Sequence, residues 1–302
     1  MQNKIAFFTS DSIAIPCLQK LNELYDLTVI TRPDKPAGRK KILTANEIAV
    51  FCNDNNIKCI KAEKNIPQSL DKNYVLAFCF SYGVIIPKDV LDYFERIINL
   101  HPSKLPQYRG PSPIQTALLN NDPETALTYM QMAQEMDAGD IISQHQIQID
   151  ENDTYQTLEA KISQLAQSTI IEIAALSLEG KMEIVPQNND LATYCQMIKK
   201  EDGLIDWFKT ADSIYNQWRA YYCWPNIYTV WNDQKIILKE IKKIPSDNNV
   251  SPGTIVMVDN TLAIQTIEGF IAIEELQLAG KSSTPARDFL NGHPDFLKAT
   301  LK

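Results

Sequence analysis

Short apolar runs alternate with helix-like segments through the first half of the chain. Runs of strand length cover Lys4–Phe8, Leu27–Thr31, Tyr74–Phe80 and Ile97–Leu100. Helical spacing of apolar residues between them predicts helices over Ile13–Leu24, Ala45–Asn55 and Pro87–Phe94. This alternation predicts an α/β fold with a Rossmann-like, mostly parallel sheet and helices on both faces. Ligands of such sheets bind at the carboxyl ends of the strands.

The second half of the chain changes character. A long helix is expected over Tyr155–Leu178, and from about Gly203 the pattern becomes one of short alternating segments divided by turns. These segments are Tyr228–Trp231, Ile236–Ile241, Gly253–Val258, Leu262–Thr266 and Phe270–Leu278. They predict a small C-terminal β-barrel. We therefore expect a first domain over residues 1–187, a linker over 188–204 and a second domain over 205–302.

Composition excludes several classes of protein. The chain has 44% hydrophobic residues and no apolar run near the length that a membrane span needs. Its net charge of -8 argues against a protein that coats nucleic acid, although a local basic patch is compatible with it. Six single cysteines and three histidines show no zinc spacing, so no metal is expected. Without a signal peptide pattern, these features predict a reduced, cytoplasmic, monomeric protein.

An amide, an imidazole and a carboxylate stand near strand ends in the first half. Asn99 and His101 follow a predicted strand, and Asp137 lies in a turn with Gly139. In acyl transfer an amide donates to a developing oxyanion, an imidazole handles a proton, and a carboxylate orients and charges the imidazole. The plain alternatives are a capping asparagine, a structural histidine and a turn-forming aspartate. A cysteine nucleophile paired with His101 also stays open.

Four glycines in this half, in a chain with only ten, mark positions with a backbone requirement. They are Gly38, Gly83, Gly110 and Gly139. No glycine-rich phosphate loop follows the first strand, which weakens a dinucleotide-binding interpretation.

From Lys4 to about Phe296 the chain resembles the methionyl-tRNA formyltransferase family of 10-formyltetrahydrofolate-dependent enzymes. The resemblance rests on Asn99-Leu100-His101, Ser103-Lys104-Leu105-Pro106, Arg109-Gly110 and Asp137-Ala138-Gly139-Asp140. It implies that Asn99, His101 and Asp137 are catalytic and that the C-terminal barrel is of oligonucleotide-binding (OB-like) type. It also implies folate contacts from the loop Ser103, Lys104, Leu105 and Pro106 and from a pocket lined by Phe80, Tyr82, Gly83 and Ile86. The formyl donor would be 10-formyltetrahydrofolate, without a metal.

The segment Thr31–Lys41 carries five positive side chains and one negative one. The plain interpretation is a solvated surface loop. The loop resembles the insertion with which the family reaches the acceptor end of tRNA, and Arg39, Lys40 and Lys41 are the matching positions. The resemblance then implies formyl transfer to the α-amino group of methionyl initiator tRNA. The alternatives are an amino sugar nucleotide as acceptor, a folate hydrolase and a non-catalytic tRNA-binding protein. A second basic stripe, Lys235, Lys239, Lys242 and Lys243, lies in the C-terminal part.

Overall fold

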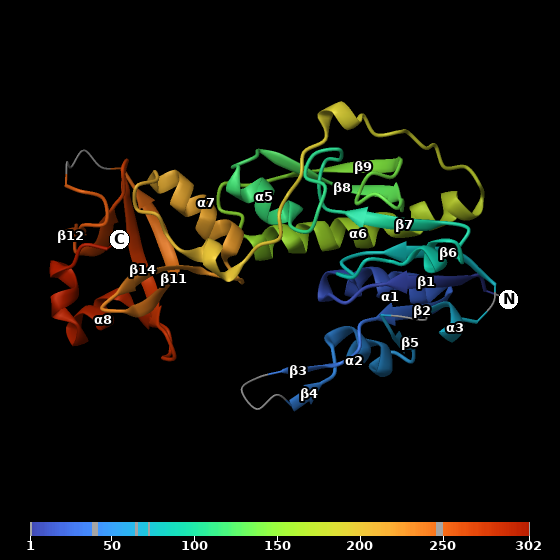
Figure 1. Ribbon diagram of the computed structural model, residues 1–302, viewed down its shortest axis with the longest axis horizontal. Helices are drawn as coiled ribbons and strands as arrows, with labels where there is room; N and C mark the ends of the chain where they lie inside the picture. Colours follow the sequence, from blue (N-terminus) through green and yellow to red (C-terminus); the bar gives the residue numbers. More distant parts are fainter. Residues whose placement is uncertain (1, 38–41, 64–65, 72, 246–249, 302) are drawn as a thin grey trace. The chain divides into compact units, whose positions relative to one another are not determined.

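The computed structural model describes residues 2–37, 42–63, 66–71, 73–245 and 250–301 (Figure 1). The chain divides into two compact units. The first comprises Met1–Pro113, Glu124–Gln148 and Glu159–Gln196, and the second comprises Ile114–Pro123, Ile149–Leu158 and Met197–Lys302. Across the described ranges, none of the helices has both the length and the apolar character needed to span a membrane.

The first unit is built on a seven-stranded sheet with the strand order β5-β2-β1-β6-β7-β8-β9. The strands are β1 (Lys4–Phe8), β2 (Asp26–Thr31), β5 (Lys58–Lys61), β6 (Tyr74–Cys79), β7 (Ile97–His101), β8 (Glu124–Gln131) and β9 (Ile141–Gln148). The pairs from β5 to β7 are parallel, and β8 and β9 pair antiparallel at one edge. The prediction of a Rossmann-like, mostly parallel sheet is therefore confirmed.

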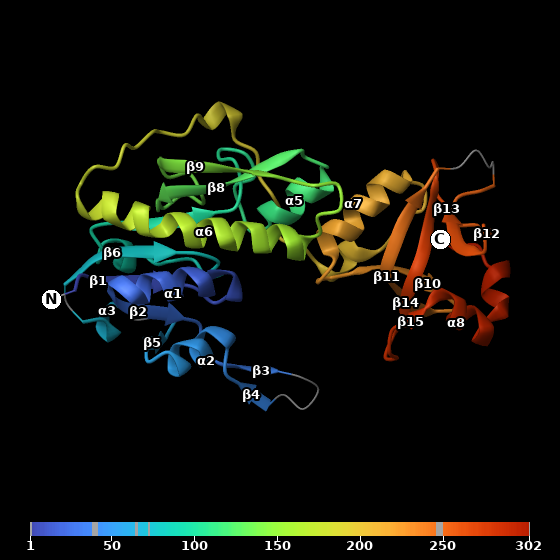
Figure 2. The ribbon, with the colours of Figure 1, turned by 180° about the vertical axis from the view of Figure 1, so that it is seen from behind.

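Helices of the first unit are α1 (Ile15–Leu24), α2 (Glu47–Asp54), α3 (Ile66–Ser69), α4 (Lys88–Leu91) and most of α6 (Tyr155–Leu178). Helices α1 and α6 lie side by side across one face of the sheet (Figure 2). The Ser163 hydroxyl on α6 donates to the carbonyl of Ile13 at 2.7 Å, just before α1. On α2 the Asn46 side chain caps the first turn by accepting from the Ala49 N–H at 2.8 Å.

For two segments of this unit, the predicted secondary structure was wrong. The helix expected over Pro87–Phe94 is only the short α4, and the Phe94 ring beyond it packs edge-on against Phe8. The segment Thr31–Lys41, expected as a loop, contains strand β3 (Lys35–Ala37), which pairs antiparallel with β4 (Ile42–Thr44). Strands β5 and β9 were not predicted.

The second unit contains an antiparallel sheet with the order β10-β11-β14-β13-β12, and β15 pairs with β14. Its strands are β10 (Ile227–Trp231), β11 (Gln234–Ile244), β12 (Ile255–Val258), β13 (Thr261–Gln265), β14 (Phe270–Leu278) and β15 (Thr284–Pro285). Its helices are α5 (Pro113–Leu119), α7 (Ala211–Tyr221) and α8 (Ala286–Gly292). Within the described ranges of both units, 3₁₀ helices cover Ser12–Ala14, Asn189–Leu191, Lys200–Gly203 and Pro294–Lys298. The antiparallel second domain agrees with the fold class that the sequence predicts.

A buried tryptophan anchors the core of this second unit. The Trp207 side chain is almost completely buried, and its indole N–H donates to the Thr229 hydroxyl on β10 at 3.2 Å. Thr229 itself is completely buried. The hydroxyl therefore satisfies a donor that water cannot reach, and its loss would leave that donor unpaired.

We expect Thr229→Val to lower the free energy of unfolding by about 1–3 kcal/mol, because the change keeps the side-chain volume but removes the acceptor of Trp207. Urea unfolding followed by tryptophan fluorescence measures this, since all four tryptophans lie between residues 207 and 231. The neighbouring reverse swap, Val230→Thr, is the control: Val230 is half exposed, and the change should cost less than about 0.5 kcal/mol. Equal losses in both variants would contradict the role of the hydrogen bond.

Candidate active site

Asn99 and His101 both lie on β7, beside the carboxyl end of β6. Residues two apart on a strand project from the same face, so their side chains share one side of the sheet. Ile98 and Leu100, which point the other way, are buried, whereas Asn99 is only half buried. In the described part of the chain, the Asn99 amide has no hydrogen-bond partner. It is therefore available to a ligand.

The imidazole of His101 is buried between two acceptors. Its Nε2 lies 2.9 Å from the carbonyl oxygen of Tyr108, and its Nδ1 lies 3.6 Å from Oδ2 of Asp137. A neutral imidazole has one N–H and can satisfy only one of these acceptors, whereas the protonated ring donates from both nitrogens. The geometry therefore holds the His101 ring between a carbonyl and a carboxylate.

Asp137 sits in the loop between β8 and β9, which closes where the Gln131 N–H donates to the Asp140 carbonyl at 2.9 Å. Its backbone is left-handed, with φ of 51°. Besides facing His101, its Oδ2 accepts the Gly110 N–H at 2.8 Å. The structure thus brings Asp137 and His101 together from segments 36 positions apart in the sequence.

Two glycines permit this arrangement. Gly110 has φ of 120°, and a Cβ there would lie 2.6 Å from the Cys195 carbonyl oxygen. A Cβ on Gly139 would lie 1.7 Å from the Gln131 carbonyl oxygen. The predicted backbone requirement is confirmed at both positions, and Gly38 lies outside the described residues.

The loop expected to contact folate is held largely by its own hydrogen bonds. Ser103 is completely buried, and its hydroxyl donates to the Gln107 carbonyl at 2.6 Å. The Lys104 ammonium forms an ion pair with Glu124 at 2.7 Å, and the buried Leu105 accepts the Gln144 amide at its carbonyl. Pro106 follows a cis peptide bond. The side chains of this loop therefore shape its backbone more than they present polar groups to solvent.

The second segment expected to contact folate follows β6. Phe80, Tyr82 and Ile86 are buried, and the Tyr82 hydroxyl donates to the Ala62 carbonyl at 2.8 Å. Gly83 has a left-handed backbone, and a Cβ there would lie 3.6 Å from the Arg32 guanidinium. Ile85, which the sequence did not single out, is 83% exposed. This exposed side chain lies between the half-buried Val84 and the buried Ile86, so it adds apolar surface to the segment.

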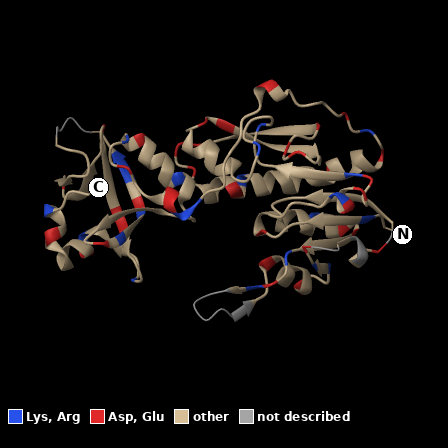
Figure 3. Cartoon of the chain, viewed as in Figure 1, with Lys and Arg blue, Asp and Glu red and all other residues tan. Residues whose placement is uncertain are grey.

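The basic residues that the sequence singled out have different outcomes in the structure. Arg39, Lys40 and Lys41 lie outside the described residues. Of the C-terminal stripe, Lys242 pairs with Glu274, Lys243 with Asp212 at 2.7 Å, and Lys239 with the Asn226 side-chain oxygen at 2.8 Å. The Lys235 ammonium lies 3.4 Å from the centroid of the Tyr228 ring. Acidic and basic bands accordingly stand next to each other on β11 and β14 (Figure 3).

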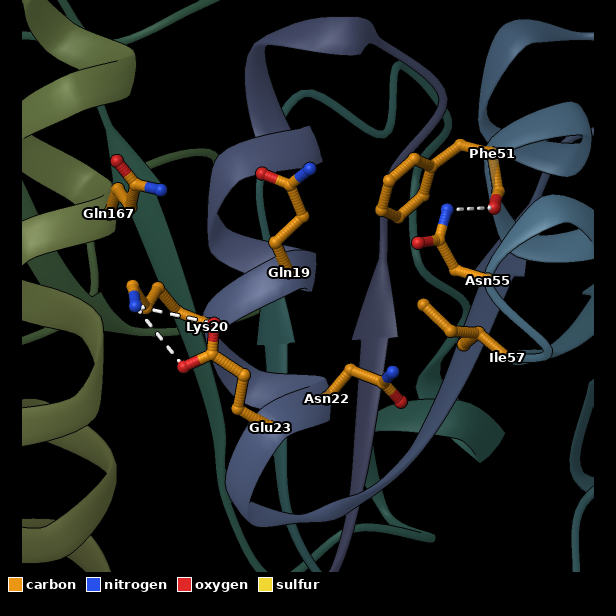
Figure 4. Close-up of a pocket in the computed structure, with 8 residues that line it drawn as sticks. All are labelled: Gln19, Lys20, Asn22, Glu23, Phe51, Asn55, Ile57 and Gln167. Atoms are coloured by element: carbon orange, nitrogen blue, oxygen red, sulfur yellow. Dashed lines mark hydrogen bonds and ion pairs between the residues drawn. The ribbon is translucent and has the colours of Figure 1, made fainter.

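Other polar clusters of the first unit are weaker candidates for a functional site. A surface hollow of about 330 Å³ lies between α1, α2 and α6 (Figure 4). Its charged groups, Lys20 and Glu23, pair with each other at 3.1 Å, and the Asn55 amide donates to the Phe51 carbonyl at 2.8 Å. Among the described residues, no three His, Cys, Asp or Glu side chains gather as metal ligands would. The His101–Asp137 pair is therefore the best-supported candidate site.

Sequence reasoning missed two backbone groups of this site. The Tyr108 carbonyl and the Gly110 N–H hold His101 and Asp137, and neither group depends on a side chain. The only sequence signal for them was the glycine at position 110, whose required conformation turns its N–H toward the carboxylate.

Two buried cysteines lie next to the site. Cys79 pairs in register with Asn99, and the Cys195 thiol donates to the Arg109 carbonyl at 3.4 Å. Burial, together with the charge of Asp137, raises the pKa of Cys79 to about 12. Burial likewise raises the pKa of Cys195. Both stay as neutral thiols near neutral pH, so neither is a good nucleophile.

Comparison with known proteins defines the class. Residues 3–174 match the family described as formyl transferase, and residues 197–294 match its C-terminal domain. The chain belongs to the formyl transferase family.

Two of its relatives are methionyl-tRNA formyltransferases. That of Caldicellulosiruptor saccharolyticus is 37% identical over 304 residues, covering 96% of each chain. That of Halalkalibacterium halodurans is 33% identical over 300 residues, covering 96% of this chain and 94% of the relative.

Solved structures share the fold. The methionyl-tRNA formyltransferase from Clostridium thermocellum superposes with a TM-score of 0.60 at 16% identity, covering 88% of this chain and 98% of that one. The N-formyltransferase from Helicobacter canadensis, in complex with folinic acid and dTDP-3-aminofucose, gives 0.67 at 21% identity, covering 90% and 99%.

We expect iodoacetamide at pH 8 to alkylate Cys79 and Cys195 more than about a hundredfold more slowly than the exposed Cys223. A raised pKa keeps each thiol protonated at this pH, and the thiolate is the reactive form. Peptide mapping by mass spectrometry after timed labelling of the native protein measures the rates. Labelling of either buried thiol as fast as Cys223 would restore a cysteine nucleophile as an alternative.

Proposed function

We propose that this protein transfers the formyl group of 10-formyltetrahydrofolate to the α-amino group of methionyl initiator tRNA. The observation that carries this proposal is the pairing of His101 with Asp137 beside the unpaired Asn99 amide. It stands in a chain that matches methionyl-tRNA formyltransferases at 33–37% identity over both domains. Such an enzyme works where charged tRNA is found, so we place it in the cytoplasm, as a monomer.

Asn99 and His101 would stabilise the charge that develops during transfer. The α-amino group of an aminoacyl ester has a pKa of about 8 or lower, so a neutral fraction is present at physiological pH. As this amine adds to the formyl carbon, negative charge develops on the formyl oxygen. The Asn99 amide would donate to that oxygen, and the protonated His101 would stabilise it electrostatically.

Asp137 would complete the transfer by supporting His101 and the proton balance. The attacking amine loses a proton and the nitrogen N10 of the folate gains one, as the bond from N10 to the formyl carbon breaks. The Asp137 side chain is 16% exposed, while His101 is buried. We assign to the two groups the passage of this proton, with Asp137 at the solvent side, either directly or through a water.

The folate would contact the loops that follow β6 and β7. We keep Ser103, Lys104, Leu105 and Pro106, and the segment with Phe80, Tyr82, Gly83 and Ile86, as its proposed contacts. Since the buried members shape the loops, the exposed Ile85 and Met136 are the apolar side chains suited to a flat heterocycle.

The formyl acceptor has an alternative, which is an amino sugar nucleotide in place of tRNA. The Helicobacter canadensis N-formyltransferase, whose structure contains dTDP-3-aminofucose, an amino sugar nucleotide, shares this fold. The near full-length match to methionyl-tRNA formyltransferases and the basic segment with Arg39, Lys40 and Lys41 both favour tRNA. We therefore propose these three cations as tRNA contacts.

The direct test is formyl transfer from 10-formyltetrahydrofolate, measured with methionyl initiator tRNA, uncharged tRNA and an amino sugar nucleotide. We expect formylation of the charged tRNA alone. In the same assay Asn99→Ala should reduce kcat about a hundred- to a thousandfold, the typical loss for one oxyanion donor. His101→Ala and Asp137→Asn should also lose most turnover while folate affinity changes little.

The control for these variants is Asn22→Ala, which removes an exposed amide on α1 and should leave kcat unchanged. Normal turnover in Asn99→Ala, His101→Ala or Asp137→Asn would remove that residue from the mechanism. Formylation of the amino sugar nucleotide instead of the tRNA would establish the rival acceptor.

Replacement of Arg39, Lys40 and Lys41 by alanine should weaken tRNA binding and reduce the salt slope of log K by about 2, as expected for three lost contacts to single-stranded phosphates. Binding titrations at several salt concentrations measure the slope. The control is Lys58→Ala, which removes a cation already paired with Asp71 at 2.6 Å. An unchanged slope in the triple variant would mean that tRNA binds elsewhere.

A further inference from the structure

One side chain outside the predicted site holds the loop that carries Asp137. The Gln187 amide nitrogen donates to the carbonyl of Asp137 at 2.8 Å and to the carbonyl of Gly139 at 2.7 Å. One amide group thus uses both of its N–H bonds on the backbone of a single short loop. It fixes the loop on either side of Ala138, next to the carboxylate that faces His101.

The oxygen of the same amide is held by a buried arginine. Gln187 Oε1 accepts from Arg109 Nε at 3.1 Å and from Arg109 Nη2 at 2.8 Å. The Arg109 side chain is 1% exposed, and Nη2 also donates to Asn189 Oδ1 at 2.7 Å. A guanidinium has only donors, so the amide of Gln187 can face it with its oxygen alone.

These contacts fix the direction of the amide. A flip of Gln187 would place its NH₂ against the guanidinium and its oxygen against two carbonyl oxygens, so four favourable contacts would become repulsive. Arg109 also precedes Gly110, whose N–H holds Oδ2 of Asp137. Residues 109 and 110 therefore hold Asp137 in two ways. Arg109 holds its backbone through Gln187, and the Gly110 N–H binds its carboxylate directly.

We propose that Gln187 is a positioning residue for Asp137, and that Arg109 acts through it. The inference rests on the proposed formyl transfer for its kinetic test. The competing explanation is that Gln187 only satisfies the buried Arg109. The two explanations separate at the amide nitrogen, because only the first needs the N–H bonds to Asp137 and Gly139.

The variant Gln187→Glu distinguishes the two explanations. The carboxylate keeps the acceptors for Arg109 but cannot donate to the two carbonyls. We expect kcat to fall between tenfold and about a hundredfold, the scale of a small displacement of a reacting group, with KM values for folate and tRNA nearly unchanged. The matched control is Asn189→Asp, the same amide-to-carboxylate change on the other acceptor of Arg109, which should keep wild-type kcat.

A double variant tests whether Gln187 acts through Asp137. In the Asp137→Asn background, Gln187→Glu should reduce kcat by less than about twofold, because the group that it positions is already lost. Independent, multiplying losses would overturn the proposal, as would wild-type kcat in Gln187→Glu alone.

A measurement that needs no acceptor completes the test. Hydrogen exchange at the Gly110 N–H reports its bond to Asp137, and we expect about tenfold faster exchange in Gln187→Glu than in Asn189→Asp or the wild type. If the wild type fails to formylate tRNA, the proposed function fails, while this comparison still decides the role of Gln187. Equal exchange in all three proteins would overturn it.

Discussion

The candidate site depends on one carboxylate oxygen, Oδ2 of Asp137. It accepts the Gly110 N–H at 2.8 Å and lies 3.6 Å from the His101 ring nitrogen, so it joins the segments that follow β7 and β8. The close packing of Gly110 on the Cys195 carbonyl allows no side chain at that position. The position of the His101 ring, the turn at Gly110 and the left-handed Asp137 are consequently parts of one arrangement.

Much of the fold could be predicted because apolar periodicity is strong where elements are buried. Strand β1, helix α6 and strand β14 have the bounds that the sequence pattern indicates. The missed strands lack that signal. In β5 both lysines are exposed and no residue is fully buried. In β9 most residues are polar and half exposed, as on a sheet edge that faces solvent. A pattern of buried residues cannot identify strands that bury so little.

The chemistry of the site was predictable only in part. Asn99 and His101 share a face because they stand two apart on a strand, and a sequence shows that directly. The contacts that hold Asp137 were not predictable, since one is the backbone N–H of Gly110 and the other, Gln187, lies 50 positions away at the end of the predicted first domain. For the lysines of β11, the sequence indicated more unpaired positive charge than the structure has. They form a basic stripe in the sequence, but Lys242 and Lys243 pair with acidic residues from other segments of the chain, and Lys239 donates to Asn226.

Backbone conformation distinguishes the site from the rest of the molecule. Among the described non-glycine residues with left-handed backbone, all are asparagine or aspartate except Ser81 and Tyr108. Asparagine and aspartate tolerate this conformation in ordinary turns, but serine and tyrosine adopt it at a cost of about 1–3 kcal/mol each. Ser81 follows β6 between residues proposed to contact folate, and Tyr108 supplies the carbonyl that holds His101. Such strain persists only where surrounding contacts impose it. Here the conformation of Tyr108 is held by the bond of its own N–H to the Thr193 hydroxyl and by the backbone bonds of Arg109 to Thr193 and Cys195. The usual backbone preferences of serine and tyrosine are therefore overridden in the loops near the candidate site. There the geometry of the site outweighs the conformational preference of the single residue.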